Sequence, residues 1–341
     1  MLLWQNLIEC ELRAIERDTM NDRCDKNRRT FKMTAIMPNY NGAHFLAKSI
    51  QSLLKQTEAF DEIIIIDDGS VDHSIAVIDS FMKANAHIRL VKHDTNQGVN
   101  IACNTGLAHA TGDYVVFCAV DDWFSPGIVR CAKKIAQEFP GIGIICGDGV
   151  IQRFDCKRSF YRMLPFRANT FLSPDEFKAI ACKSYVGFNS AGGMFMCRRA
   201  ILQAGMIHST AYWHADWLLY FIIALRHGIY YCNEVFIHVN LREASYSEGK
   251  KNNKIQNRVM LGIIHIIAKH YPDLWDDFRQ AALIPHHALR YIPLLWLDPL
   301  GRKFMTKRLI WKVLINNHLV VRASRLFPYS LVLKIRKLAK A

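Results

Sequence analysis

Hydrophobic and polar positions alternate in blocks along this chain from residue 34 onward. Short apolar runs of strand length end in Gly, Asn, Asp or Ser, and amphipathic segments of helix length follow them. The predicted strands are Thr34 to Met37, Glu62 to Ile66, Ile88 to Lys92, Tyr114 to Cys118 and Ile142 to Cys146. The predicted helices are Phe45 to Gln56, Ser74 to Met82, Val99 to His109 and a segment after Pro126 that ends at Phe139. We therefore expect an α/β fold with a mostly parallel sheet and helices on both faces.

The rhythm changes after Cys146. A helix is predicted to begin at Ser173-Pro174, and an apolar helix opens at His214 and ends at His227. A strand is predicted from Ile229 to His238, and helices follow it. The expected parts are an N-terminal helix and linker at 1–33, a main domain at 34–250 with halves 34–150 and 151–250, and a basic helical region at 251–341.

The positive charge is concentrated at the C-terminal end of the chain. The net charge is +14, and residues 251–341 carry 17 Lys and Arg against 4 Asp and Glu. In residues 302–341 apolar positions recur at helical spacing between the basic ones, as in helices that lie on an anionic membrane surface. A helical cap with a solvated basic face explains the same pattern. No recognised nucleic-acid-binding module accompanies the charge, which argues against nucleic acid as a partner.

Composition favours a cytoplasmic protein. No run reaches the roughly 18 apolar residues that a membrane-spanning helix needs, and no basic segment precedes the apolar N-terminal stretch. The ten Cys include no Cys-x-x-Cys pair, so we expect reduced, structural thiols. If the basic region binds lipid, the expected location is peripheral, on the inner face of the cytoplasmic membrane.

Two adjacent carboxylates, Asp121 and Asp122, follow the predicted strand Tyr114 to Cys118. In an open α/β sheet, ligands bind at the carboxyl ends of the strands. A pair of carboxylates at that edge can hold a divalent cation together with the phosphates of a ligand. The pair is therefore a candidate cation and phosphate site.

Four motifs, ending with this carboxylate pair, occur in order between residues 35 and 122. They are Ala35-Ile36-Met37-Pro38-Asn39-Tyr40-Asn41, Ile64-Ile65-Ile66-Asp67-Asp68-Gly69-Ser70, Asn96-Gln97-Gly98 with Asn104-Thr105-Gly106-Leu107, and Gly112-Asp113 through Asp121-Asp122. In this order they resemble the family 2 inverting glycosyltransferases, which have the A-type nucleotide-diphosphosugar transferase (GT-A) fold. The resemblance makes residues 34–250 the expected catalytic domain, with the nucleotide-sugar site in its first half and the acceptor site in its second.

The resemblance implies a donor site. Pro38 and Tyr40 would border the nucleobase, and Asp68 would accept a hydrogen bond from the imide N–H of uracil or thymine. A capping or turn role is the structural alternative for Asp68. Asp121 would stand at the ribose, and Asp121 and Asp122 would hold Mg²⁺ or Mn²⁺ at the diphosphate.

The carboxylate motif departs from the family's common Asp-x-Asp-Asp pattern. Ala119 stands where the family usually has its first Asp. The departure leaves open which Asp ligates the cation and how tightly the cation binds.

The resemblance also implies a base and two donor contacts. Asp216 is the predicted base that deprotonates the acceptor hydroxyl, with a helix N-terminal role as the structural alternative, and His214 is the weaker rival. Gly192 and Gly193 would lie under the donor sugar and the acceptor. Arg242 would close over the diphosphate, although a surface salt bridge would explain it as well.

These features predict a metal-dependent inverting glycosyltransferase that uses a UDP- or dTDP-linked donor. The expected acceptor is a glycan or a lipid-linked acceptor in the assembly of a surface polysaccharide. One rival is a non-catalytic sugar-nucleotide or glycan-binding protein with a degenerate metal motif, which Ala119 suggests. The other is a nucleotidyltransferase, although the loop from Pro38 to His44 lacks the Lys and Arg that would grip a triphosphate.

Overall fold

The computed structural model describes residues 30–153, 158–161, 164–183, 186, 192–241, 252–285 and 287–316. The chain forms two compact units. The first comprises Met1–Pro174, Gly187–Ser209 and Ala215–Ser245, and the second comprises Asp175–Val186, Thr210–His214 and Tyr246–Ala341. The domain boundaries expected from the sequence stay predictions.

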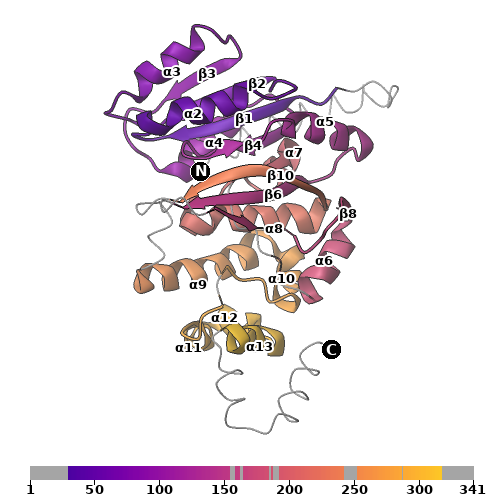
Figure 1. The fold of residues 1–341 in the computed structure, drawn as a ribbon. Coiled ribbons are helices and arrows are strands. Elements are labelled where there is room, and N and C mark those ends of the chain that lie inside the picture. The colour runs from indigo at the N-terminus through magenta and orange to yellow at the C-terminus, as the bar shows by residue number, and fades with distance from the viewer. Residues whose placement is uncertain are drawn as a thin grey trace. The chain divides into compact units, whose positions relative to one another are not determined.

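One sheet of ten strands, as far as the described residues go, forms the centre of the first unit (Figure 1). Its strands are β1 (Met33–Asn39), β2 (Glu62–Asp67), β3 (Ile88–Lys92), β4 (Tyr114–Phe117), β5 (Trp123–Phe124), β6 (Ile144–Arg153), β7 (Arg158–Tyr161), β8 (Thr170–Leu172), β9 (Met194–Cys197) and β10 (Ile229–Leu241). The helices of this unit are α2 (Ala43–Leu54), α3 (Ser74–Met82), α4 (Val99–His109), α5 (Ile128–Glu138), α7 (Arg198–Gln203) and α8 (Ala215–His227).

The strand order is β3-β2-β1-β4-β9-β6-β10-β5, with β7 on β6 and β8 on β10. Strands β3, β2, β1 and β4 pair in parallel with one another in that order, and β6 pairs in parallel with β10. Strand β9 lies antiparallel between β4 and β6, so the strands on its two sides run in the same direction. The predicted α/β fold with a mainly parallel central sheet is confirmed.

Strand β2 shows why the sheet needs cover on both faces. All six of its residues are buried, although side chains point alternately to the two faces of a strand. Helix α4 covers it closely at Gly106, where a Cβ atom would lie 2.8 Å from the Ile66 side chain. No larger residue fits there without displacing the helix.

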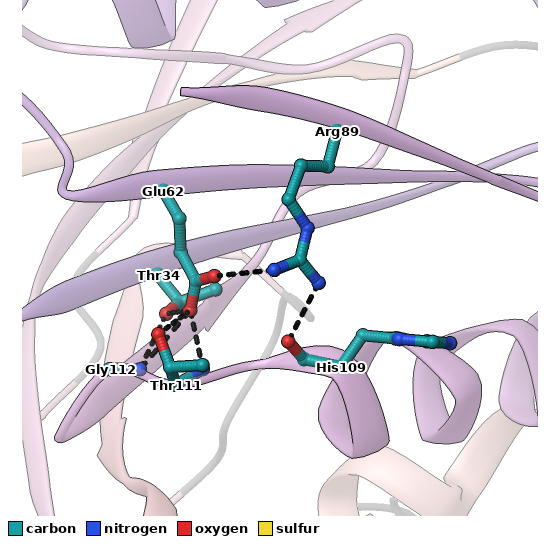
Figure 2. Close-up of polar contacts among 6 residues, drawn as sticks. All are labelled: Thr34, Glu62, Arg89, His109, Thr111 and Gly112. Carbon is teal, nitrogen blue, oxygen red and sulfur yellow. Dashed lines mark hydrogen bonds and ion pairs between the residues drawn. The ribbon is translucent and has the colours of Figure 1, made fainter. Parts of the chain in front are cut away.

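Glu62 anchors a polar network at the amino ends of these strands (Figure 2). Its Oε1 accepts hydrogen bonds from Thr34 Oγ1 at 2.5 Å, Thr111 N at 2.5 Å and Gly112 N at 3.1 Å. Its Oε2 lies 3.7 Å from Nη1 of Arg89. The carboxylate therefore ties the start of β1 to the turn before β4, at the edge opposite the strands' carboxyl ends.

The second unit is helical in its described residues. Its helices are α6 (Pro174–Lys183, all but its first residue), η2 (Ser209–His214, likewise), α9 (Asn253–His270), η4 (Pro272–Leu274), α10 (Trp275–Gln280), α11 (Tyr291–Leu297), α12 (Pro299–Phe304) and α13 (Lys307–Asn316). Asn252 caps α9 by accepting hydrogen bonds from the N–H groups of Lys254 and Ile255. Among the described residues, no helix has both the length and the apolar content to cross a bilayer.

Candidate active site at the carboxyl edge of the sheet

The loops that follow β1 and β2 lie side by side, because these strands run in parallel with Asn39 opposite Asp67. The carboxylate of Asp67 accepts hydrogen bonds from Asn39 Nδ2 at 2.7 Å and from Ser70 N at 3.0 Å. Ser70 Oγ in turn accepts from the main-chain N–H of Asn41 at 2.8 Å. Asp67 thus shapes both loops, and Tyr40 stays 48% exposed beside them.

Asp68, in the loop after β2, forms hydrogen bonds with the loop after β3. It is 3% exposed, and its oxygens accept from Gln97 N at 2.9 Å and Gly98 N at 2.8 Å. His93 Nδ1 lies 2.7 Å from Oδ1 of Asp68, and His93 Nε2 lies 2.9 Å from Thr105 Oγ1. Three partners therefore hold this carboxylate, which is the candidate reader of the nucleobase.

His93 is a residue that the sequence reasoning missed. It follows directly after strand β3, at the same edge as the predicted site residues. Its position at the end of a predicted parallel strand was the available signal.

The Asp121-Asp122 pair lies on a loop that crosses from β4 to β10. Asp122 is 7% exposed, its main-chain N–H donates to Ala119 O at 3.2 Å, and its Oδ1 accepts from Asn240 N at 2.9 Å. Strand β5 directly follows Asp122 and pairs with β10. The pair is therefore held against β10 rather than projecting freely from the end of β4.

Side-chain contacts of Trp123 and His238 hold the loop from β4 to β10 in place. The indole ring of Trp123 lies parallel to the His238 ring at a centroid distance of 5.4 Å. Lys48 Nζ lies 3.0 Å from the Trp123 ring centroid. Ser125 Oγ lies 3.0 Å from Nε2 of His238. These contacts fix the residue next to Asp122.

The carboxylates fit a cation only if a ligand shares it. Among the described residues, no group of three His, Cys, Asp or Glu side chains could hold a metal ion. Mg²⁺ usually takes one or two carboxylates and completes its octahedron with substrate phosphates and water. Asp121 and Asp122 match that smaller donor set, with one oxygen of Asp122 bound to Asn240.

Gly192 and Gly193 lie at this edge as well. They directly precede β9, which is antiparallel to β4, so the start of β9 lies beside the end of β4. A Cβ atom on Gly193 would lie 3.0 Å from the Ile237 side chain on β10, and its φ is +79°. Glycine therefore allows the loop to lie directly against β10.

Asp216 stands at the start of α8, whose direction brings it to the same edge. At the other end of the helix, His227 O accepts a hydrogen bond from Gly143 N, just before β6. Helix α8 packs on β6, and this bond makes it run antiparallel to the strand. Its first turn, with Asp216, is thus directed toward the carboxyl ends. The side chain of Asp216 accepts from Trp217 N at 2.7 Å.

The charges of these carboxylates contribute to raised pKa values of two buried thiols. Burial and, second, the charge of Asp216 raise the pKa of Cys103 on α4. Burial and, second, the charge of Asp122 raise the pKa of Cys118, with a smaller effect of Asp121. Cys118 directly follows β4 and Cys103 lies one turn into α4, so both acidic sites lie close to elements of the carboxyl edge.

The remaining predicted residues are placed differently. His214 belongs to the second unit and is 7% exposed. Its Nε2 lies 3.0 Å from Gln256 Nε2, and Gln256 Oε1 accepts from Trp213 Nε1 at 2.7 Å. These contacts explain His214 by packing, and its acceptor contact stays a prediction. Arg242 lies outside the described residues.

Comparison with known proteins gives a family match. The family model described as Glycosyl transferase family 2 matches residues 34–205, which span the loops described above. The uncharacterized glycosyltransferase YibD of Escherichia coli is 37% identical over 109 residues, 32% of this chain and 31% of the relative. Glycosyltransferase GlyA of Streptococcus pneumoniae is 34% identical over 108 residues, 32% of this chain and 15% of the relative. The chain thus aligns with less than a third of the length of either relative.

Solved structures share the fold. The crystal structure of Staphylococcus aureus TarS 1-349 has a TM-score of 0.57 at 16% identity, over 74% of this chain and 69% of that chain. The complex of the same protein with UDP-GlcNAc has a TM-score of 0.59 at 15% identity, over 74% and 70% of the two chains.

Proposed function

The chain belongs to glycosyl transferase family 2, and from this premise we propose that it moves a sugar from a UDP- or dTDP-linked donor to an acceptor hydroxyl with inversion. One observation carries the proposal. The carboxylates of Asp68, Asp122 and Asp216 come from three distant segments, and the strand and helix directions bring all three to the carboxyl edge of one sheet. Ligands of open α/β sheets bind at that edge.

In the proposed donor site, Asp68 accepts the imide N–H of the base. A carboxylate can only accept hydrogen bonds, so it suits uracil and thymine and disfavours the unprotonated N3 of cytosine. The fold neighbour TarS was solved with UDP-GlcNAc, which supports a uridine nucleotide as the first donor to test.

Asp121 and Asp122 would hold Mg²⁺ or Mn²⁺, and a bound cation neutralises the charge that grows on the departing diphosphate. Asp216 would take the proton of the acceptor hydroxyl as that oxygen attacks the anomeric carbon. Its place in the first turn of α8 favours the ionised carboxylate, because the helix dipole stabilises negative charge there.

The proposed acceptor is a glycan or a lipid-linked acceptor in surface polysaccharide assembly. Peripheral attachment to the inner face of the cytoplasmic membrane would bring the protein to such an acceptor. The basic amphipathic pattern of residues 302–341 predicts this attachment, and residues 317–341 lie outside the described residues.

Calorimetric titration of the purified chain with UDP, dTDP and GDP, each with and without Mn²⁺, tests the donor site. We expect UDP or dTDP to bind, and to bind more tightly with Mn²⁺. If none of the three nucleotides binds, the proposal of a donor site is wrong. A nucleotidyltransferase would instead bind a nucleoside triphosphate and release pyrophosphate.

Asp122→Asn tests the role of Asp122 in cation binding separately from its role in stability. The substituted side chain can still accept from Asn240 N, so thermal stability should change little. The enhancement of UDP affinity by Mn²⁺ should fall about tenfold or more, because one charged ligand is lost. If Mn²⁺ enhances the UDP affinity of the variant as much as that of the unchanged protein, Asp122 does not ligate the cation.

A further inference from the structure

Helix α11 is apolar on its covered side and on its exposed side. Its sequence is YIPLLWL, and Tyr291 and Leu295 are buried at 1% and 3% exposure. Trp296 is 61% exposed and Leu297 is 78% exposed. A surface helix normally turns charged or polar residues outward, so this outward apolar side is a candidate contact surface.

Two exposed basic residues, Arg302 and Lys303, lie on the helix that packs on α11. Helix α12 follows α11 directly and packs on it so closely that a Cβ atom on Gly301 would lie 2.6 Å from Leu295 O. This approach places the exposed Arg302 and Lys303 on the element beside Trp296 and Leu297. In the described part of the chain, neither Arg302 nor Lys303 has a carboxylate partner.

The charge of residues 287–316 is mostly positive. Residues 287–316 carry six Lys and Arg and a single acidic residue, Asp298. The Asp298 side chain is only 17% exposed and accepts hydrogen bonds from Gly301 N at 2.7 Å and from His265 Nε2 at 3.0 Å. Within residues 287–316 the exposed charge is therefore positive, which favours an anionic partner. The exposed Asp276 on the neighbouring α10 is paired with Arg279, at 2.7 Å.

We propose that the surface formed by Trp296, Leu297, Arg302 and Lys303 docks on an anionic phospholipid bilayer. The exposed indole and the leucine beside it enter the boundary between headgroups and acyl chains, where Trp side chains are favoured. Arg302 and Lys303 contact the lipid phosphates. The seven-residue α11 is far too short to span a bilayer, so the proposed contact lies at the bilayer surface.

Vesicle co-sedimentation of the full chain tests this docking. Two kinds of vesicle are used, phosphatidylcholine alone and phosphatidylcholine mixed with phosphatidylglycerol. We expect binding to the mixed vesicles only. Trp296→Ser with Leu297→Ser should weaken it about tenfold or more, since both side chains lose apolar burial. Arg302→Gln with Lys303→Gln should weaken it roughly 25-fold, because each basic residue at an anionic surface contributes about a fivefold factor.

Matched controls come from the first unit. Val71 is 89% exposed and apolar, and Lys83 is exposed and basic, so Val71→Ser and Lys83→Gln should bind vesicles like the unchanged protein. All the substituted residues are exposed, so the melting temperatures should agree closely.

Fluorescence quenching by brominated lipid gives an independent readout. Bromine on the acyl chains should quench the emission of the unchanged protein and should quench Trp296→Phe much less. Docking on the bilayer is overturned if both double variants bind the mixed vesicles as the unchanged protein does. It is equally overturned if the apolar double variant loses self-association in sedimentation velocity but keeps vesicle binding, which would make the surface an interface between copies. The result does not depend on transfer activity, so its failure is separate from failure of the proposed function.

Discussion

Oδ1 of Asp68 lies 2.7 Å from Nδ1 of His93, and the side chains of both residues are almost fully buried. The opposite ring nitrogen of His93 lies 2.9 Å from Thr105 Oγ1 on α4. The ring thus joins the candidate nucleobase reader to a helix, and it holds the carboxylate together with the N–H groups of Gln97 and Gly98.

His93→Phe should weaken UDP binding about tenfold, because a hydrogen bond to a charged group contributes roughly 1.5–3 kcal/mol and, among the described residues, only two main-chain N–H groups would still hold Asp68. Thr105→Val is the matched control, since it removes only the outer hydrogen bond of the ring and should cost less. Calorimetry with UDP and CDP measures both affinity and base selectivity. Equal UDP affinity in His93→Phe and in the unchanged protein would show that His93 does not position Asp68.

The Glu62 network should stabilise the fold without affecting the site (Figure 2). Glu62→Leu removes the acceptor of the buried Thr34 Oγ1 and of the N–H groups of Thr111 and Gly112, and should lower the free energy of unfolding by about 2–4 kcal/mol. Glu62→Gln keeps one acceptor oxygen and should cost less. Denaturant titration measures both.

Asp79→Asn on the exposed side of α3 serves as the control for Glu62 and should stay within about 0.5 kcal/mol. The affinity of the folded Glu62 variants for UDP should be unchanged, because the network lies at the opposite edge of the sheet. A Glu62→Leu protein as stable as the control would contradict this account.

Lys312 should make stability depend on alkaline pH. Burial and, second, the nearby Arg308 lower the pKa of Lys312 to about 8, and its Nζ donates to Ala281 O at 2.7 Å. Below pH 8 the folded state must keep a charge that burial disfavours. Between about pH 8 and the unfolded pKa of about 10.4, the unfolded chain binds more protons, so stability should rise with pH.

Lys312→Met should remove this rise and raise the stability near pH 7 by about 1–2 kcal/mol, a value reduced for solvent screening. Melting temperatures at pH 7, 8 and 9 measure the effect. Lys307→Met, at an exposed position of the same helix, is the control. A melting curve of Lys312→Met that follows the unchanged protein at each pH would contradict the lowered pKa.

Local patterns predicted most of the sheet. Helices α3 and α4 and strand β3 have the predicted bounds, because each is delimited by polar or glycine residues that stop it. Strands β5, β7, β8 and β9 were missed. Strand β5 has two residues and exists only through its pairing with β10, and β9 follows a glycine loop that the sequence did not distinguish from further loop. Pairing between distant segments has no local signal.

The same reason limits what could be predicted of the site. The positions of Asp67, Asp68, Asp121 and Asp122 follow from strand ends, which are local features. The hydrogen bond from Asn240 N to Asp122 joins residues 118 apart and depends on the register of β10. Such contacts require the tertiary structure.

Asp216 is the residue on which the proposed chemistry depends most. Asp216→Asn keeps an acceptor for Trp217 N and should leave the melting temperature and the UDP affinity nearly unchanged. Transfer should fall by a factor of about 10²–10⁴, the usual contribution of a general base.

The most direct measurement is release of UDP or dTDP from a panel of sugar nucleotides by the purified protein with Mn²⁺, because glycosyltransferases pass some sugar to water when no acceptor is present. The account predicts release from at least one UDP- or dTDP-linked sugar, and loss of that release in Asp216→Asn with nucleotide binding intact. Binding of the nucleotides without release from any sugar nucleotide, or full release by Asp216→Asn, would contradict it.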